Sequence, residues 1–242
     1  STHGALGALA FGIGATEVAH VLATQTLWQR PPRTMRVTVD GMLRDGVTAK
    51  DVFLHIAGIY GDHATQNVEF GGPGMKGLSI NARKTLSTMG AELSCEFATF
   101  EYDEVLGDYL KARGRTQFEP VHPDKDAKYF DVRRVDLDKI EPLVALPDSV
   151  LKNSRGVKNV AGTRVDQAFI GSCANGTLDD LTLAARVLAG RKVSPKTRLI
   201  VTPGSMYVYR EALKSGAIAT LAEAGAVITN PTCGACGGGH MG

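Results

Sequence analysis

The sequence has 242 residues, of which 27 are Lys or Arg and 25 are Asp or Glu, so its formal net charge is +2. A chain of this length can bury a sizeable core as one large or two smaller domains. The small charge argues against a polybasic nucleic-acid surface and against an acidic tail. Because the sequence has no long apolar run, no leader and few cysteines, we expect a cytoplasmic protein without membrane or nucleic-acid partners.

The first half of the sequence alternates strand-like and helix-like segments. Val18 and Val21 recur at helical spacing, and Thr48 opens a helix with an apolar face. We expect, in chain order, a helix within 4–24, a strand at 36–40, a helix from 48, a strand at 67–70, a helix at 78–93, a strand at 96–102 and a helix at 104–113. Glu92 falls in the last turn of the helix at 78–93, and Arg83 on that helix is expected at the surface.

The second half continues this alternation after a Pro- and charge-rich excursion at 117–126. A polar stretch at 149–160 is a candidate linker. The elements expected beyond it are a strand at 168–171, a helix at 179–189, a strand at 198–202, helices at 206–214 and 217–224, and a strand at 226–229. Strands that alternate with helices of this length favour a parallel sheet covered on both faces.

Three cysteines follow predicted strands directly. Cys173 lies just after the strand at 168–171, and Cys233 and Cys236 lie in a glycine-rich stretch after the strand at 226–229. In open α/β sheets, ligand sites gather at the carboxyl ends of the strands. Two thiolates three residues apart can wrap one metal centre while a third arrives from elsewhere in the fold. The sequence therefore predicts a metal site with three converging thiolates.

Four interpretations of these cysteines compete. A structural zinc would need a fourth ligand such as His240, but zinc sites with C-x-x-C usually lie in small ribbon or knuckle units. A thioredoxin-like dithiol needs a helix that begins at the pair, and residues 237–239 are all glycine, a poor helix opening. Buried, inert cysteine suits Cys95. The favoured interpretation is an iron–sulfur cluster with three protein thiolates, which leaves one iron open to a substrate hydroxyl or carboxylate.

The segments around these cysteines carry a family resemblance. The segments are Gly171-Ser172-Cys173-Ala174-Asn175-Gly176 with Asp179-Asp180-Leu181, then Thr232-Cys233-Gly234-Ala235-Cys236, and upstream Met89-Gly90-Ala91-Glu92. They resemble the aconitase superfamily of iron–sulfur hydro-lyases and, within it, the large subunits of 3-isopropylmalate dehydratase and homoaconitase. The resemblance extends over nearly the whole chain.

The resemblance implies roles for individual residues. A [4Fe-4S] cluster would be bound by Cys173, Cys233 and Cys236. The substrate would meet the catalytic Glu92 and three substrate-binding residues, Thr88, Asn175 and Ser172. Thr88 stands where the family usually has Asn, so the hydrogen bonds offered to a substrate differ. The catalytic base and the substrate-binding arginines are expected outside these residues, because the sequence looks like part of a longer chain.

The resemblance also implies an architecture of aconitase-like three-layer α/β/α domains with mostly parallel sheets. On this basis residues 1–34 would end a first domain and residues 35–150 would form a second. Residues 151–242 would form an incomplete third domain that carries the cluster cysteines.

The implied function is a hydro-lyase that dehydrates and rehydrates a hydroxy di- or tricarboxylic acid. The favoured reaction is the interconversion of 3-isopropylmalate and 2-isopropylmalate in leucine biosynthesis. A separate small subunit with a swivelling domain would complete the site. The alternatives are a homoaconitase-like or 2,3-dimethylmalate-type dehydratase and, from a different class, a non-catalytic metal-binding or RNA-binding module, against which the small net charge speaks.

Overall fold

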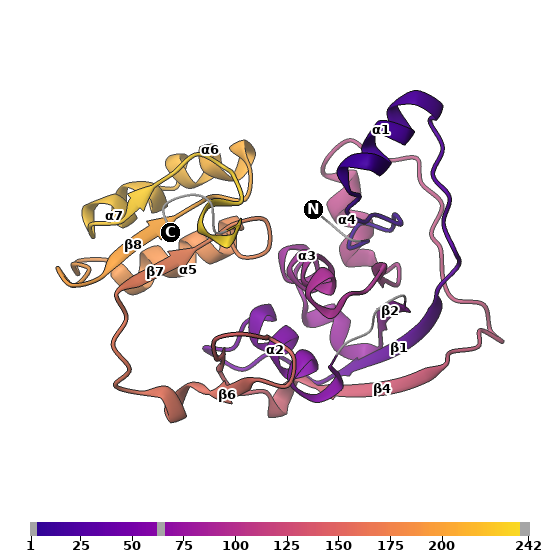
Figure 1. Ribbon diagram of the computed structural model, residues 1–242, viewed down its shortest axis with the longest axis horizontal. Helices are drawn as coiled ribbons and strands as arrows, with labels where there is room; N and C mark the ends of the chain where they lie inside the picture. The colour runs from indigo at the N-terminus through magenta and orange to yellow at the C-terminus, as the bar shows by residue number, and fades with distance from the viewer. Residues whose placement is uncertain (1–3, 62–65, 238–242) are drawn as a thin grey trace. The chain divides into compact units, whose positions relative to one another are not determined.

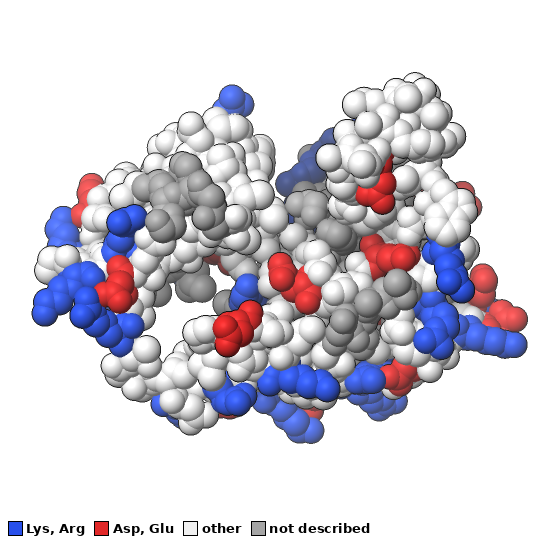
Figure 2. All heavy atoms as spheres, viewed as in Figure 1, with Lys and Arg blue, Asp and Glu red and all other residues white. Residues whose placement is uncertain are grey.

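The computed structural model describes residues 4–61 and 66–237 (Figure 1). The chain divides into two compact units, Ser1–Asn159 and Val160–Gly242. The threefold division at residues 34 and 150 stays a prediction. Figure 2 shows charged side chains of both signs on the face in view, in keeping with the small net charge. No helix among the described residues is both long and apolar enough to cross a membrane.

The first unit is built on a parallel sheet. Its elements are α1 (Ala15–Thr24), β1 (Arg33–Asp40), α2 (Ala49–Tyr60), β2 (Gln66–Gly71), α3 (Ile80–Met89), β3 (Phe97–Phe100), α4 (Glu104–Lys111), β4 (Asp131–Asp136), β5 (Leu143–Ala145) and β6 (Ser154–Gly156). Short 3-10 helices η1 (Pro73–Gly77), η2 (Gly90–Leu93), η3 (Leu137–Lys139) and η4 (Val157–Val160) lie between them. Four parallel strands pair in the order β3-β2-β1-β4, and β5 pairs with β6 antiparallel.

The central strand β1 shows why the sheet has two unlike faces. Met35, Val37 and Val39 alternate along it and are fully buried, whereas the side chains between them are half-buried. Helices α2 and α3 pack against one another and lie on the same side of the sheet (Figure 1). Thr48 caps α2 in a capping box with Asp51, as the sequence indicates.

Two stretches of this unit differ from the sequence-based expectations. The helix expected within 4–24 begins only at Ala15, because Gly4 and Gly7 adopt positive φ angles of 110° and 81° that interrupt a helix. The linker expected at 149–160 instead belongs, up to Asn159, to the first unit. Within it, β6 pairs with β5, and Ser154 Oγ donates a hydrogen bond of 3.0 Å to the Leu54 carbonyl on α2.

The second unit follows the predicted rhythm closely. Its elements are β7 (Gln167–Ile170), α5 (Leu178–Leu188), β8 (Arg198–Val201), α6 (Met206–Lys214), α7 (Ala217–Glu223), β9 (Val227–Ile228) and the 3-10 helix η5 (Gly234–Gly237). The strands are parallel in the order β7-β8-β9. Leu199 and Val201 of β8 pack with Leu181 of α5 and Leu221 of α7 in one apolar core. The expected α/β class with mostly parallel sheets is therefore confirmed.

Candidate functional site

Both cysteine-bearing loops begin at the carboxyl-terminal ends of strands in the parallel sheet of the second unit. Cys173 follows β7, which ends at Ile170, and Cys233 follows β9, which ends at Ile228. Because all three strands are parallel, these loops emerge at the carboxyl ends on either side of β8. The placement predicted for the cysteines is the one that the structure has.

Thr202, directly after β8, joins the two loops. Its backbone N–H donates to the Ile170 carbonyl at 2.8 Å, and its Oγ1 lies 2.6 Å from Thr229 Oγ1 at the end of β9. A methyl group on Gly171 would come within 2.5 Å of the Thr202 carbonyl oxygen, and one on Gly234 within 2.9 Å of Thr202 Oγ1. The glycines beside Cys173 and Cys233 thus allow both loops to pack on one buried threonine.

The loop at Cys173 is fixed by the start of α5. Thr177 and Asp180 form a capping box, in which Thr177 Oγ1 donates to Asp180 Oδ2 at 2.6 Å. The Gly176 N–H donates to the Ser172 carbonyl at 2.9 Å and closes the turn that contains Cys173. Ser172 is buried, so its hydroxyl is less accessible than the Cys173 thiol, which is exposed.

The three thiols are soft metal ligands and follow strands of one parallel sheet, as an iron–sulfur cluster would require. In this structure, however, the three sulfur atoms do not converge on one point. Cys173, Cys233 and Cys236 are all exposed. Within residues 4–61 and 66–237, no group of three His, Cys, Asp or Glu side chains could hold a metal ion. His240, the ligand that a zinc site would recruit, lies outside the described residues. Cys95, expected to be inert, is buried with 8% exposure.

One buried polar atom near Cys173 suits a bound group. The side-chain Oδ1 of Asn175 is buried and accepts no hydrogen bond from any described residue. An unsatisfied buried acceptor costs about 1–3 kcal/mol unless a ligand or water donates to it. This orphan acceptor and the soft, exposed thiols together fit an occupied site beside the Cys173 loop.

Glu92 and Thr88 lie in the first unit, around the end of α3. The α-helix ends at Met89, so Glu92 lies in η2 and not in the last α-helical turn. Its carboxylate is exposed, whereas Thr88 is buried at 7% exposure. The structure therefore places the seven predicted site residues in two separate units, five after β7 and β9, among which Ser172 is buried, and two at the end of α3 and in η2.

The expectation for Arg83 is wrong, because this side chain is completely buried. Its guanidinium makes a bidentate ion pair with Asp103 at 2.7 and 2.6 Å and donates to the Met75 and Leu78 carbonyls at 2.9 and 3.2 Å. Arg83 therefore ties the glycine-rich segment around η1 to α3 and to the start of α4. Burial would raise the pKa of Asp103, but hydrogen bonds from Arg83 and the Leu106 N–H outweigh it and lower that pKa.

Sequence reasoning missed Asp103 and Thr202. Asp103 precedes a predicted helix, which marks it as an N-cap, and it does accept a hydrogen bond from the Leu106 N–H at 3.1 Å. Thr202 ends a predicted strand that would lie between the two cysteine-bearing strands. In both cases the sequence indicated the local position of the residue, at a helix start or a strand end, but not the distant residues that it contacts.

Known proteins of one family match this chain along its whole length. The model of the aconitase family (aconitate hydratase) matches residues 1–155 and 149–242. The 3-isopropylmalate dehydratase large subunit of Mycolicibacterium smegmatis is 49% identical over 99% of this chain and 57% of its own length. The probable methanogen homoaconitase large subunit of Methanothermobacter thermautotrophicus is 42% identical over 100% of this chain and 56% of its own length.

The chain thus spans little more than half the length of these curated relatives. Among solved structures, aconitase X of Thermococcus kodakaraensis in its holo-form has a TM-score of 0.45 and 17% identity, over 84% of this chain and 44% of that one. The family model covers the chain from its first residue to its last, across both compact units. The chain therefore belongs to the aconitase family.

Proposed function

We propose that this chain is part of the large subunit of an iron–sulfur hydro-lyase that interconverts 3-isopropylmalate and 2-isopropylmalate in leucine biosynthesis. The observation that carries the proposal is that the two cysteine-bearing loops both pack on Thr202, at the carboxyl-terminal ends of β7, β8 and β9. It is supported by the names of the relatives, among them the 49% identical dehydratase large subunit.

In this proposal Cys173, Cys233 and Cys236 hold a [4Fe-4S] cluster. When bound, a cluster with three protein thiolates supplies a Lewis-acidic iron for a substrate oxygen. The Cys173 loop, fixed by the capping box of α5, would hold its thiol in place. The orphan Oδ1 of Asn175 would accept a hydrogen bond from a substrate hydroxyl, with the Ser172 hydroxyl as a neighbouring donor.

Glu92 is proposed as the catalytic carboxylate of the chain. Its side chain is exposed, so it is available to exchange a proton with a substrate hydroxyl. Thr88 lies four residues before it, in the last turn of α3, and would contribute a hydroxyl where most of the family has an amide. The base that removes the proton beside a carboxylate, and the arginines that bind carboxylates, would come from outside these residues.

The proposed partner is a small subunit that carries a swivelling domain, because the relatives are named large subunits. A cytoplasmic location remains part of the proposal, since exposed thiols persist in a reducing compartment. A second candidate function is that of a homoaconitase, which the 42% identical homoaconitase large subunit favours.

The cluster is tested by measuring iron, acid-labile sulfide and zinc after anaerobic reconstitution of the chain. We expect about four irons per chain with matching sulfide, and their loss in Cys173→Ser. Cys95→Ala is the matched control, because Cys95 is buried and should not affect iron content. Zinc without sulfide would contradict the proposal. Turnover is then tested with isopropylmalate, homocitrate, citrate and dimethylmalate in the presence of a small subunit, and homocitrate turnover alone would select the second candidate.

A further inference from the structure

A cavity in the first unit lies apart from every residue assigned above. It encloses about 500 Å³ between β2, β3, α4 and the chain segments 6–9 and 118–123. This volume falls in the range of small-molecule sites, about 300–1,000 Å³. None of the seven proposed site residues lines it.

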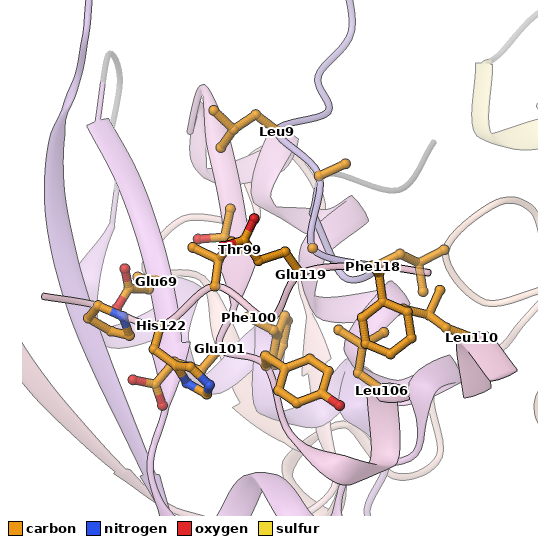
Figure 3. Close-up of a pocket in the computed structure, with 16 residues that line it drawn as sticks. Leu9, Glu69, Thr99, Phe100, Glu101, Leu106, Leu110, Phe118, Glu119 and His122 are labelled. Carbon is orange, nitrogen blue, oxygen red and sulfur yellow. The ribbon is translucent and has the colours of Figure 1, made fainter. Parts of the chain in front are cut away.

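The two ends of the cavity differ in chemistry. Figure 3 shows Glu69, Glu101 and His122 toward one end, and Phe118 and Leu110 toward the other. The apolar end is strengthened by aromatic contact, since the rings of Tyr102 and Phe118 lie 5.8 Å apart between centroids. A ligand that fits both ends has a polar head and an apolar body.

The polar end carries more negative than positive charge. Arg36 is the cation that faces Glu69 and Glu101; it forms an ion pair with each, at 2.6 Å between Nη2 and Glu101 Oε1. One guanidinium thus compensates one of these two carboxylates, and Glu119 adds a third carboxylate at the exposed rim. Of the described residues that line the cavity, none is Lys or Arg.

Tyr129 stabilises this arrangement without changing its charge. Its hydroxyl donates to Glu69 Oε1 at 2.8 Å. Burial and the hydrogen bond with Glu69 raise the pKa of Tyr129 to about 12, so the phenol remains a neutral donor at physiological pH. Glu69 and Glu101 are thus held by Tyr129 and Arg36, and the excess negative charge remains available to a ligand.

We propose that this cavity binds a small organic ammonium ion with an apolar, preferably aromatic, body. The ammonium group would lie against Glu101 and Glu119, and the body would lie between the Phe118 ring and the α4 side chains. A di- or tricarboxylic acid would be repelled by the same carboxylates. The cavity is therefore not a second site for the proposed substrate, and the inference is independent of the proposed function.

The test is isothermal titration of the 242-residue chain with phenethylammonium. Its neutral isostere, phenethyl alcohol, and its anionic counterpart, hydrocinnamate, are titrated alongside. We expect the ammonium to bind about tenfold more tightly than the alcohol, because hydrogen bonds to charged groups are the stronger ones. We expect no binding of hydrocinnamate, and weaker ammonium binding as salt is added. Equal affinity for ammonium and alcohol would overturn the proposal.

Variants locate the binding. Glu101→Gln should weaken ammonium binding about tenfold, and Glu119→Gln, which alters an exposed side chain, about threefold. Glu223→Gln, an exposed carboxylate of the other unit, is the matched control and should leave the affinity unchanged. If neither cavity variant weakens binding, the ligand binds elsewhere and the proposal is wrong.

A last titration separates two sources of the ammonium group. Nα-acetyl-lysine methylamide presents the same charge on the stem of a protein side chain. Tighter binding of phenethylammonium than of this derivative supports a small-molecule ligand. Binding of the lysine derivative without binding of phenethylammonium would assign the cavity to a protein side chain and overturn the small-molecule proposal.

Discussion

The two compact units fix their glycine-rich loops by different means. In the first unit, the segment around η1 is tied down by the buried guanidinium of Arg83, which pairs with Asp103 and two carbonyls. In the second unit, the cysteine loops are held by backbone that packs directly on Thr202, at positions where only glycine fits. The first arrangement depends on buried charge and the second on the absence of a side chain.

This difference determines which changes each unit tolerates. A buried ion pair is most sensitive to the loss of one partner, because the other charge is left uncompensated. A close contact at a glycine is most sensitive to added atoms, because the nearest atoms at Gly171 and Gly176 are backbone and cannot move aside. The exposed cysteines take part in neither arrangement, so the residues that would hold the cluster contribute little to the stability of the polypeptide.

The largest expected effect is that of Arg83→Met. It removes the cation from the buried pair and leaves Asp103 beside a desolvated space, so we expect a loss of about 3–5 kcal/mol in the free energy of unfolding. Urea denaturation followed by circular dichroism measures it. Arg186→Met, which alters an exposed arginine on α5, should change stability by less than about 0.5 kcal/mol.

A double variant sharpens this result. Arg83→Met with Asp103→Asn keeps a side-chain acceptor for the Leu106 N–H and removes the stranded charge. We expect it to be less destabilised than the sum of the two single variants. Equal destabilisation by Arg83→Met and Arg186→Met would show that the ion pair contributes nothing.

Gly176→Ala tests the steric arrangement of the second unit. A methyl group there would meet the carbonyl oxygens of Ser172 and Thr202, both at 2.5 Å. We expect a loss of about 1–3 kcal/mol, as for other overpacked sites, together with reduced iron retention. Gly12→Ala is the control, since a methyl group on Gly12 meets nothing within 4 Å. Unchanged thermal stability of Gly176→Ala would refute the close packing.

A smaller effect is expected from Tyr129 in alkaline solution. The unfolded phenol ionises near its usual pKa of 10.0, whereas the folded one ionises at about 12. Above pH 10 the unfolded state therefore binds fewer protons, and stability falls as pH rises toward 12. Denaturation series across this window should show a shallower decline for Tyr129→Phe. The stability of Tyr207→Phe, which alters an exposed side chain on α6, should decline as steeply as that of the wild type. If the stability of Tyr129→Phe also declined that steeply, the raised pKa of Tyr129 would be contradicted.

Local patterns predicted most of the fold. The alternation after Val165 predicted each strand and α-helix of the second unit, because apolar periodicity and turn residues are local signals. The polar stretch at 149–160 was misassigned as a linker, since β6 is only three residues long, pairs with another short strand, β5, and packs with it on α2. Such tertiary contacts cannot be recognised in the hydropathy pattern of the sequence.

The placement of the cysteines after two parallel strands was predictable from the sequence, but the residues that support their loops were not. Spacing alone singled out Cys173, Cys233 and Cys236, because few other arrangements explain a thiol pair after one strand and a third after another. Arg83 was wrongly expected at the surface, because a single charged residue on a helix is usually exposed to solvent. Its partner Asp103 is 20 residues away in the sequence, so the pair was not apparent. Thr202 became recognisable only once the register of β7, β8 and β9 was known.

The smallest expected effect is that of Cys233→Ser on the cluster-free chain. The thiol is exposed, so replacing sulfur by oxygen should change the free energy of unfolding by less than about 0.5 kcal/mol. The same variant should lose iron after reconstitution, because a hydroxyl is a poor substitute for a thiolate ligand. Cys95→Ser, at a buried position, should instead lose about 1–3 kcal/mol of stability and retain iron. If Cys233→Ser destabilised the cluster-free chain as much as Cys95→Ser does, the cysteine loops would be part of the core, and the contrast between the two units would fail.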